Sequence, residues 1–590
     1  MASLSPYRSQ PPCKRIPYGM TNFISIIRDD CYFVDKTSFI ERVERANKFF
    51  FFIRPRRFGK TMTVSMLQHY YDVKDADIFE EIYGGLYIGQ HPTPEHNQYL
   101  VLSLNFSTIQ AGLEGYKESL DAYCNICFTE FCSRYADLLP AGTAEKLRGC
   151  RGAVEQLNVL CYGCSDAGQK IYLFLDEYDH FTNKILAEPA CLDEYKCQTH
   201  GTGYLRLFFD AIKLGTSSAI ERVFITGVSP VTLDDLTSGF NIGTNYSLHP
   251  DFNEMSGFTE EEVRDMLAYY ASVLPFEHSV DELMDIMKPW YDNYCFSPSC
   301  YGMTTMYNSC MVLYFLDNYI GHRFTIPANL IEDNIRVDYA KLRMLIRHDK
   351  DFTHDASVIQ QLVSNGFITG ELKTGFPAEQ IGKPENFVSL LFYFGLITLD
   401  GTYRGHTRFV IPNEVVREQI FTYLLDTYAE NDLRYDAYAI QEPESCLAYD
   451  GNWKPYFQYI ADTLHRYASQ RDRQKGESFV HGFTLAMTCQ SRFYRPVSES
   501  DTQAGYADIF LRPRLETYGD MKHSYIVELK YAKTADSDDR VAILREAAVA
   551  QVKRYAASET VGEAIGPTML HRLVIVYRGT EMVVCEEVLP

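Results

Sequence analysis

The feature that most constrains this chain is a series of short, mostly apolar runs separated by longer stretches with helical periodicity. The apolar runs lie at 48–53, 99–106, 171–175 and 222–226, and helix-compatible stretches lie among them at 60–71 and 113–135. Strands that are apolar on both faces are typical of a parallel sheet covered by helices on either side. The pattern therefore predicts an α/β fold with a parallel sheet in the N-terminal part of the chain.

The second half of the chain has a different pattern. Helical periodicity covers 259–274 and 280–287, which predicts a helical lid, and 357–411 combines short helices with strands expected at 396–399 and 408–411. Residues 441–475 are expected to form a connecting segment with an amphipathic helix. The last section returns to an α/β pattern, with helices expected at 477–487 and 541–555 and strands at 507–511, 525–530 and 573–577.

Charge limits the classes of partner. The chain has 56 Lys and Arg against 78 Asp and Glu, a net charge of −22. Binding to nucleic-acid phosphates needs clustered positive charge, so any such site must be a local basic patch on an acidic body.

The apolar runs and the cysteines indicate in which compartment of the cell the protein is expected. No apolar run approaches the roughly eighteen residues that cross a bilayer, and residues 1–14 lack the apolar centre of a signal peptide. The 16 cysteines of a chain this long do not resemble a small secreted disulfide scaffold. We expect an intracellular protein, cytoplasmic or nuclear, with mostly reduced thiols and no membrane partner.

Residues 51–61 (FFIRPRRFGKT) follow the first apolar run and lead into a helical stretch. A loop at this position presents backbone N–H groups and a helix N-terminus to an anion. Gly59 allows close approach of the backbone, Lys60 can reach β- and γ-phosphates, and the Thr61 hydroxyl can bind Mg²⁺. Arg54 occupies the place of the first glycine of the Walker A pattern. The segment predicts an ATP site.

Residues 171–179 (IYLFLDEYD) are an apolar run that ends in carboxylates, the Walker B arrangement. Asp176 would hold Mg²⁺, directly or through water, and Glu177 would act as the general base that polarises the attacking water. Thr226 or Ser229, at the end of the run at 222–226, could sense the γ-phosphate. Polar residues are common at strand ends, so an acidic or hydroxyl end that simply meets solvent is the alternative.

Residues about 16–310 resemble the AAA-ATPase-like family that is often fused to a PD-(D/E)XK nuclease. The matching segments are 16–19 (IPYG), 32–37 (YFVDKT), 54–61, 175–179, 224–229 (FITGVS), 257–261 (GFTEE), 290–294 (WYDNY) and 307–308 (YN). The resemblance implies that Asp35 and Lys36 lie near the nucleotide and that Arg57 belongs to the phosphate loop. It also implies a turn at Asn293, where the family pattern has glycine and where asparagine tolerates the left-handed conformation.

A carboxylate–lysine cluster is expected near the C-terminus. Glu528 and Lys530 are two residues apart on an expected strand and therefore project to the same side, where Asp508 of a neighbouring strand can join them. Two carboxylates and a backbone carbonyl suit Mg²⁺ or Mn²⁺, and Lys530 could orient the water or stabilise charge on the scissile phosphate. A surface salt bridge between Glu528 and Lys530 is the alternative. Glu477 on a helix could add a third acidic ligand.

Residues about 470–590 are similar in spacing to the PD-(D/E)XK nuclease superfamily, with its α-β-β-β-α-β core. The positions that match its pattern are Glu477, Asp508, Glu528, Lys530, Gln551 and Tyr555. Ala507 replaces a nominal proline that carries no chemistry. The resemblance implies metal-assisted phosphodiester hydrolysis, with Gln551 facing the pocket and Lys553 and Arg554 near phosphates, unless the domain keeps the fold without the activity.

These observations predict five regions: a flexible N-terminus (1–15), an AAA-like P-loop ATPase core (16–250), a helical lid (251–340), a winged-helix-like connecting region (341–440) and a nuclease-like domain (441–590). The expected function is ATP binding and hydrolysis that regulates or drives a Mg²⁺- or Mn²⁺-dependent endonuclease. The expected partner is nucleic acid, DNA before RNA, with a homo-oligomer left open. The alternatives are a nucleotide-gated switch or effector with an inactive nuclease fold, and an ATPase that remodels proteins.

Two Cys-x-x-Cys pairs give a ligand count typical of zinc sites. They are Cys124 with Cys127 and Cys161 with Cys164. The first pair lies in an expected helix, where such cysteines usually serve as small apolar core residues. Zinc at these pairs stays open from the sequence.

Overall fold

The fold is taken from a computed structural model of the 590-residue chain. It describes residues 13–109, 115–180, 203–231, 242–327, 329–332, 358–377, 380, 383–430, 436, 438–467, 476–497, 500–502 and 505–589. Most of the expected flexible N-terminus lies outside these residues. The chain divides into two compact units, Met1–Phe352 with Thr369–Asn413, and Thr353–Ile368 with Glu414–Pro590. We call them the N-terminal and C-terminal units and describe each by itself.

A five-stranded parallel sheet forms the centre of the N-terminal unit. Its strand order is β2 (Leu100–Asn105), β3 (Ile171–Asp176), β4 (Ile220–Gly227), β1 (Phe49–Ile53) and β5 (Thr244–Asn245). Every neighbouring pair is parallel. The parallel sheet predicted from the four apolar runs is therefore confirmed, and β5 is an additional short strand.

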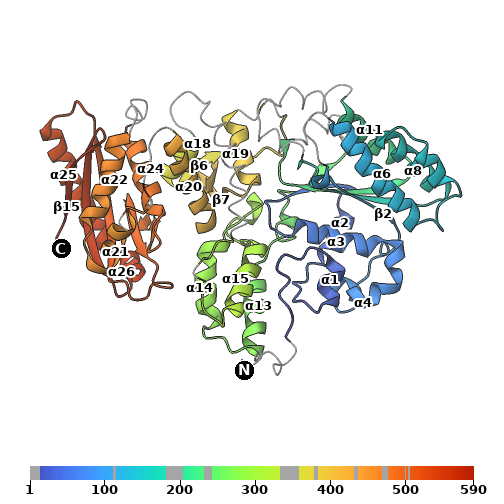
Figure 1. The fold of residues 1–590 in the computed structure, drawn as a ribbon, viewed down its shortest axis with the longest axis horizontal. Helices are drawn as coiled ribbons and strands as arrows, with labels where there is room; N and C mark the ends of the chain where they lie inside the picture. The colour runs from blue at the N-terminus through green and yellow to red at the C-terminus, as the bar shows by residue number, and fades with distance from the viewer. Residues whose placement is uncertain are drawn as a thin grey trace. The chain divides into compact units, whose positions relative to one another are not determined.

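Helices cover both faces of this sheet (Figure 1). Helix α3 (Lys60–Tyr71) lies on one face with α1 (Phe23–Arg28), α2 (Phe39–Arg45) and α4 (Phe79–Tyr83). The other face carries α6 (Tyr116–Arg134), α8 (Ala153–Asp166) and α11 (Tyr204–Gly215). Strands β1, β3 and β4 are buried on both sides over almost their whole length, which is why they read as continuous apolar runs.

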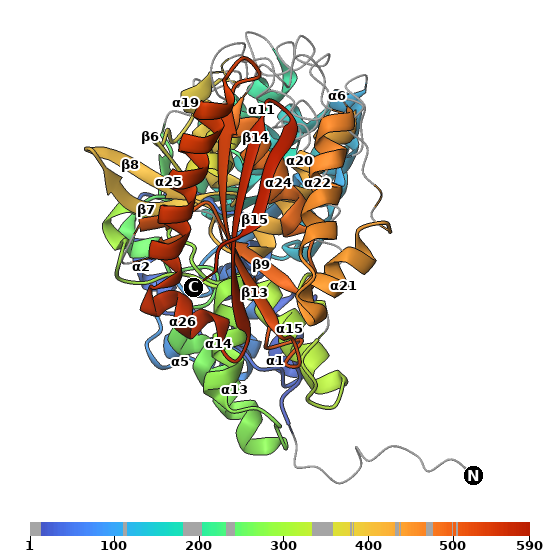
Figure 2. The same cartoon turned by 90° about the vertical axis from the view of Figure 1, so that its left-hand side faces the viewer.

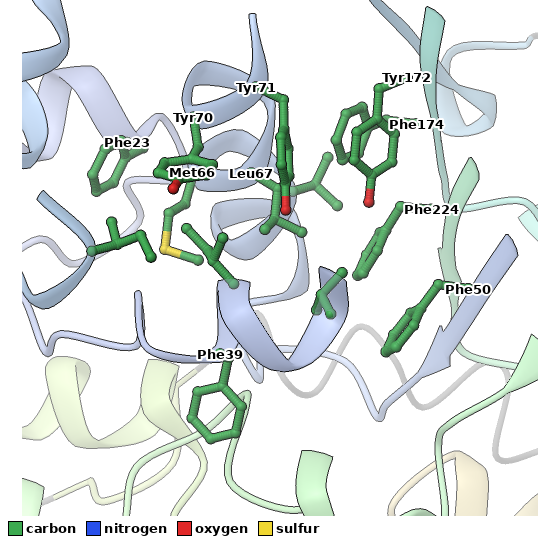
Figure 3. Close-up of a cluster of buried hydrophobic side chains, with 14 of the residues drawn as sticks. Phe23, Phe39, Phe50, Met66, Leu67, Tyr70, Tyr71, Tyr172, Phe174 and Phe224 are labelled. Atoms are coloured by element: carbon green, nitrogen blue, oxygen red, sulfur yellow. The ribbon is translucent and has the colours of Figure 1, made fainter. Parts of the chain in front are cut away.

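The core between the sheet and α3 is largely aromatic (Figure 3). Phe50 of β1 stacks on Phe224 of β4 with ring centroids 5.2 Å apart, and Tyr172 stacks on Phe174 of β3 at 4.4 Å. Tyr71, near the end of α3, lies 4.8 Å from Tyr172. These rings fix α3 on the sheet, and with it the loop that enters the helix.

The region of the N-terminal unit predicted as a helical lid contains α13 (Glu260–Val273), α14 (Val280–Tyr291) and α15 (Ser309–Gly321). Thr259 and Ser279 each form a capping box with a glutamate three residues later, which sets where the first two helices begin. Asn293 has φ of +79°, so the left-handed turn expected there is confirmed. Strands β7 (Thr398–Tyr403) and β8 (His406–Val410) form an antiparallel hairpin, with bounds that differ by one to four residues from those predicted.

The C-terminal unit has a mixed sheet of order β15 (Glu581–Glu587), β14 (Met569–Arg578), β13 (His523–Ala532), β12 (Ile509–Pro513) and β9 (Tyr494–Val497). Only β13 and β14 are parallel. Helix α25 (Asp538–Ala556) lies on one face, and α24 (Glu477–Cys489) and α22 (Lys454–Tyr467) lie on the other (Figure 2). Strands β9 and β15, at the edges of the sheet, were not predicted, because β9 has only four residues and the short apolar run of β15 lies between glutamates.

The strand predicted at 507–511 is two strands. Strand β11 (Gly505–Ala507) pairs with β10 (Ser500–Thr502), whereas β12 pairs with β13 and β9. The remaining elements are α5 (Tyr87–Gln90), α7 (Thr143–Arg148), α18 (Val358–Asn365), β6 (Phe367–Gly370), α19 (Pro384–Tyr393), α20 (Glu414–Glu430), α21 (Gln441–Asp450), α26 (Glu559–Ile565) and the 3-10 turns η2 (Val73–Ile78), η3 (Phe106–Thr108), η5 (Pro250–Phe252) and η6 (Pro298–Cys300). Within the described ranges, none of the helices is both long and apolar enough to span a bilayer.

Candidate functional site

The loop between β1 and α3 closes on its own lysine. Arg57 and Gly59 both have left-handed backbone, with φ of +68° and +81°, and Gly59 caps the N-terminus of α3. The Lys60 ammonium donates hydrogen bonds to the carbonyls of Arg54 at 3.0 Å and Pro55 at 2.8 Å. The loop thus forms a ring around a buried ammonium group at a helix N-terminus, which is the geometry of an anion site.

The end of β3 supplies the acidic partner of this loop. Asp176 is buried, and its Oδ2 accepts hydrogen bonds from the Thr61 hydroxyl at 3.0 Å and the Asn105 side-chain amide at 3.4 Å. Burial and the charge of Glu177 raise the pKa of Asp176. Glu177 has φ of +53°, and its N–H donates to Asp176 Oδ1 at 3.0 Å. The structure therefore brings Thr61 and Asp176 together, and Asn105 is a neighbour that sequence analysis missed.

The charges at this edge act on one another. Burial lowers the pKa of Lys60, while the charges of Glu177, Asp176 and Asp179 oppose that shift. Three carboxylates and one ammonium group therefore lie at the carboxyl edge of the sheet. That is where ligands bind in open α/β sheets.

The two hydroxyl residues expected to sense phosphate differ in their surroundings. Thr226 is buried in β4, and its hydroxyl has no hydrogen-bond partner among the residues that the structure describes. The Ser229 hydroxyl accepts a bond from the N–H of Val231 at 3.2 Å, and the Ser229 carbonyl accepts one from the Tyr178 hydroxyl at 2.5 Å. Both lie at the same end of the sheet as Asp176, because Thr226 is one residue beyond the Leu175–Ile225 pair.

Arg54, which replaces a glycine of the Walker A pattern, is part of the core. Its guanidinium donates to the carbonyls of Ser247 at 2.6 Å and Phe252 at 2.8 Å. It also lies 4.3 Å from the ring centroids of Phe52 and of Phe296. Only 1% of Arg54 is exposed, so it anchors the loop from behind and does not face a phosphate.

Helix α15 contacts the loop between β1 and α3 through Arg57. The Arg57 carbonyl accepts hydrogen bonds from the Ser309 hydroxyl at 3.2 Å and the Cys310 N–H at 3.3 Å, at the start of α15. The Arg57 guanidinium forms an ion pair with Glu332 at 2.5 Å. Arg57 therefore couples the loop to α15, a contact that no sequence pattern indicated.

Asp35 and Lys36 have partners within the protein. Asp35 Oδ1 accepts hydrogen bonds from the N–H and the hydroxyl of Thr37, and Asp35 Oδ2 accepts one from the N–H of Tyr87. The buried Lys36 ammonium lies 2.6 Å from Glu262 Oε1 on α13. A contact of either residue with nucleotide stays a prediction.

In the C-terminal unit, β13 carries the carboxylate–lysine cluster. Lys530 Nζ lies 2.6 Å from Glu528 Oε1 and 3.5 Å from Asp508 Oδ2, and the N–H of Leu529 donates to Asp508 Oδ2 at 2.8 Å. The three charged side chains converge, as the two-residue spacing on the strand predicted. Asp508 itself lies in the bend between β11 and β12 and not inside a strand.

Glu528 is the most constrained member of this cluster. It is 1% exposed, and its Oε2 is buried with no hydrogen-bond partner among the described residues. Burial, followed by the charge of Asp508, raises the pKa of Glu528. An acceptor oxygen left unpaired in such a place is costly unless a ligand or water completes it.

Helix α24 brings a further residue to Asp508. His481 Nε2 lies 3.2 Å from the Asp508 carbonyl. Glu477 is four residues earlier in the same helix, and residues at this spacing share a helix face. The charge of Glu477 also raises the pKa of Tyr531, after the contribution of burial and of Asp536, so Glu477 lies near the end of β13. His481 was not predicted, although its spacing from Glu477 was a usable signal.

The residues predicted on α25 lie outside the cluster's contacts. Gln551 is half-buried and Lys553 and Arg554 are exposed. Arg554 donates to the Tyr555 hydroxyl at 3.1 Å. Among the described residues, Gln551 and Lys553 form no hydrogen bond or ion pair with Asp508, and their roles stay predictions.

The donor atoms of the cluster determine whether it fits a divalent cation. Within the described ranges, no three His, Cys, Asp or Glu side chains are already arranged as a metal site. Asp508 and Glu528 nevertheless converge on one positive group, and no described residue hydrogen-bonds to Glu528 Oε2. Two carboxylates of this kind fit Mg²⁺ or Mn²⁺, which retain several waters when bound by few protein ligands.

These features define two classes of domain, a P-loop nucleotide-binding domain and an α/β domain of nuclease type. The comparison with family models agrees. The model described as "Predicted AAA-ATPase" (AAA-ATPase-like) matches residues 17–237, and the model of the PD-(D/E)XK nuclease superfamily matches residues 475–587. The chain therefore carries an AAA-ATPase-like domain followed by a PD-(D/E)XK nuclease superfamily domain, in the order predicted.

Known proteins add little to this assignment. A protein from Azotobacter chroococcum mcd 1, titled "Uncharacterized protein in vnfD 5'region", is 25% identical over 288 residues, 48% of this chain and 48% of the relative. The chain thus matches about half the length of that relative. A crystal structure of a Signal Transduction ATPase with Numerous Domains protein with a tetratricopeptide repeat sensor, from Pyrococcus horikoshii, is 12% identical and covers 82% of this chain and 60% of that chain, with a TM-score of 0.22. At that score the likeness carries no argument.

Proposed function

We propose that this protein binds and hydrolyses ATP and that its C-terminal domain is a metal-dependent endonuclease whose action ATP regulates or drives. The observation that carries the proposal is the convergence of Asp508, Glu528 and Lys530, with Glu528 Oε2 buried and without a hydrogen-bond partner in the part of the chain that the structure describes. The same chain also carries the loop in which Lys60 donates to two backbone carbonyls, with the neighbouring Thr61 bonded to Asp176.

The nuclease chemistry follows from the donor set. Asp508 and Glu528, with Glu477 from α24, would hold Mg²⁺ or Mn²⁺, which would activate a water and stabilise charge on the phosphate when bound. Lys530 would leave the two carboxylates to orient the water or to stabilise negative charge on the scissile phosphate. Gln551, Lys553 and Arg554 would contact the nucleic acid from α25. DNA is the preferred substrate class in this proposal.

The ATPase chemistry uses the carboxyl edge of the parallel sheet. Lys60 would exchange its two carbonyl partners for the β- and γ-phosphates, with the loop at Arg57 and Gly59 around them. Thr61 and Asp176, already in contact, would hold Mg²⁺. Glu177 would act as the general base.

Contacts with the γ-phosphate are assigned to Thr226 and Ser229. The unpartnered Thr226 hydroxyl supports this assignment. Asp35 and Lys36 are proposed to lie near the nucleotide on the strength of the family resemblance.

The test is cleavage of labelled duplex DNA, single-stranded DNA and RNA by the full chain with Mg²⁺ or Mn²⁺, each with ATP, with ADP and without nucleotide. Coupling requires that nucleotide favour one global state. We expect metal-dependent cleavage whose rate, or whose accompanying oligomeric state, changes with ATP. Equal cleavage and equal sedimentation in all three nucleotide conditions would indicate two unconnected activities.

One observation favours a second function, a nucleotide-gated switch or effector with an inactive nuclease fold. The Lys530 ammonium lies at the point where the two carboxylates converge, so it satisfies the charges that a cation would otherwise satisfy. If the parent chain cleaves no DNA or RNA with either metal, with or without ATP, this second function replaces the first.

A further inference from the structure

Asp179 is a buried carboxylate at the carboxyl edge of the parallel sheet. The proposed ATPase mechanism gives it no role. It lies three residues beyond Asp176, is 0% exposed, and follows the left-handed Glu177. Its Oδ2 accepts hydrogen bonds from the N–H groups of Val228 at 3.1 Å and Ser229 at 2.6 Å, directly after β4. Asp179 therefore ties the chain that follows β3 to the chain that follows β4.

The contact between Asp179 and the end of β4 is tightly packed around Gly227. A Cβ at Gly227 would lie 2.5 Å from Asp179 Oδ1 and 2.6 Å from ring atoms of Tyr178, so glycine is required there for space. The Tyr178 N–H donates to the Thr226 carbonyl at 3.2 Å, and the Tyr178 hydroxyl donates to the Ser229 carbonyl at 2.5 Å. Ser229 is thus held through both its N–H and its carbonyl.

Burying the Asp179 carboxylate costs free energy of folding, so a role in stability alone does not explain its presence. Asp179 Oδ1 is buried with no hydrogen-bond partner among the described residues. Burial and the charge of Glu177 raise the pKa of Asp179 to about 6. Buried polar atoms without partners are rare, and they are most readily accounted for at functional sites.

We infer that Asp179 is a positioning residue for ATP hydrolysis: its hydrogen bonds to Val228 and Ser229 hold Ser229 at a fixed place relative to Glu177. This inference rests on the proposed hydrolysis of ATP at this edge. Asp179 acts through the backbone after β4 and does not touch the nucleotide. Losing it displaces Ser229 from the γ-phosphate, and a misplacement of about 1 Å near reacting groups can cost about a hundredfold in rate.

The experiment compares the steady-state ATPase activity of the full chain with that of Asp179→Ala and Asp179→Asn. Asparagine keeps an oxygen that can accept both N–H bonds, whereas alanine removes them. We expect Asp179→Ala to lose about a hundredfold in kcat with KM for ATP little changed, and Asp179→Asn to recover most of kcat. The matched control is Asp72→Ala, which removes another buried carboxylate that accepts a backbone N–H, from Lys74, at the opposite end of α3. It should lower stability and leave kcat at the parent value.

The possible failures are distinguishable. Parent-level kcat in a folded Asp179→Ala chain overturns the inference and leaves the ATPase proposal intact, and a parent chain that does not hydrolyse ATP overturns both. Loss in Asp179→Asn equal to the loss in Asp179→Ala would also overturn the inference, because the hydrogen bonds would then not be the cause. If Asp179→Ala does not fold, Asp179→Ser takes its place, since its shorter side chain cannot reach both N–H groups, and parent-level kcat there has the same meaning.

Discussion

Two lysines in this molecule are satisfied in opposite ways. Lys60, in the N-terminal unit, donates to two neutral carbonyls of its own loop. Lys530, in the C-terminal unit, is paired with the carboxylates of Glu528 and Asp508. A phosphate can replace neutral carbonyls without separating an ion pair. A cation at Glu528, by contrast, must first displace the ammonium of Lys530.

The pKa shifts of the two lysines follow the same difference. Burial lowers the pKa of Lys60, and the carboxylates nearby only partly oppose it. Burial also acts to lower the pKa of Lys530, but the charges of Asp508 and Glu528 outweigh it and raise that pKa above its ordinary value. Lys60 can therefore accept an added negative charge. Lys530 would leave its two carboxylates only when another cation binds them.

The largest expected effect is on cleavage at the cluster of Asp508, Glu528 and Lys530. Asp508→Ala and Glu528→Ala should each abolish cleavage by removing the cation while ATP hydrolysis continues. Lys530→Ala should lose cleavage by at least about a hundredfold, the scale seen when one preorganised charge-stabilising group is removed. It should nevertheless bind Mn²⁺ at least as well as the parent, because the competing ammonium is gone. Weaker Mn²⁺ binding by Lys530→Ala, measured by calorimetry, would contradict this comparison.

At the site of Lys60 and Glu177, substitutions should separate ATP binding from ATP hydrolysis. Lys60→Ala removes the charge that meets the phosphates, so ATP affinity should fall. Glu177→Gln should keep ATP affinity and lose hydrolysis by about a hundredfold or more, because the water loses its base. Fluorescent-nucleotide titration and phosphate release measure the two effects. If Lys60→Ala binds ATP as the parent does, the phosphate loop is elsewhere.

The buried carboxylate of Asp179 should make the free energy of unfolding depend on pH. The pKa of Asp179 is about 6 in the folded chain against an ordinary 3.8, so the native state binds the extra proton between these values. The free energy of unfolding therefore falls as pH rises through this window, and the cost, about 3 kcal/mol, is fully present above it. Asp179→Asn should accordingly be more stable than the parent at pH 8, by an amount of this order, and gain much less at pH 4. An equal gain at both pH values in chemical denaturation would contradict the assignment.

The smallest expected effect concerns the lid contact. Glu332→Gln weakens the partner that holds the Arg57 guanidinium, which frees Arg57 to meet phosphate. ATP should then bind more tightly, by up to about tenfold, the scale of one hydrogen bond to a charged group, since the Arg57 guanidinium no longer has to leave a buried carboxylate. Glu81→Gln, which disrupts the exposed pair with Arg28, is the control and should leave ATP affinity unchanged. Weaker ATP binding by Glu332→Gln would mean that the pair supports the loop and does not compete with nucleotide.

Local patterns in the sequence were enough for much of the fold. The helix predicted at 60–71 is α3 with the same bounds, and each predicted strand of the parallel sheet is present. Strands β9 and β15 escaped prediction, because β9 has only four residues and the four apolar residues of β15 lie between glutamates. The place of Asp508 between two strands also escaped, since β11 and β12 are adjacent in sequence and pair with different partners.

By itself, the sequence determined which residue types meet at each site. A strand followed by Gly59, Lys60 and Thr61 places a lysine at a helix N-terminus, and the two-residue period of a strand places Glu528 and Lys530 on one side. Only the tertiary structure decided the partners of those residues. It placed Arg54 in the core, brought Asp179 to the backbone after β4, and buried Glu528 beside Lys530. Periodicity is a property of one segment, whereas burial and pairing depend on segments far apart in the chain.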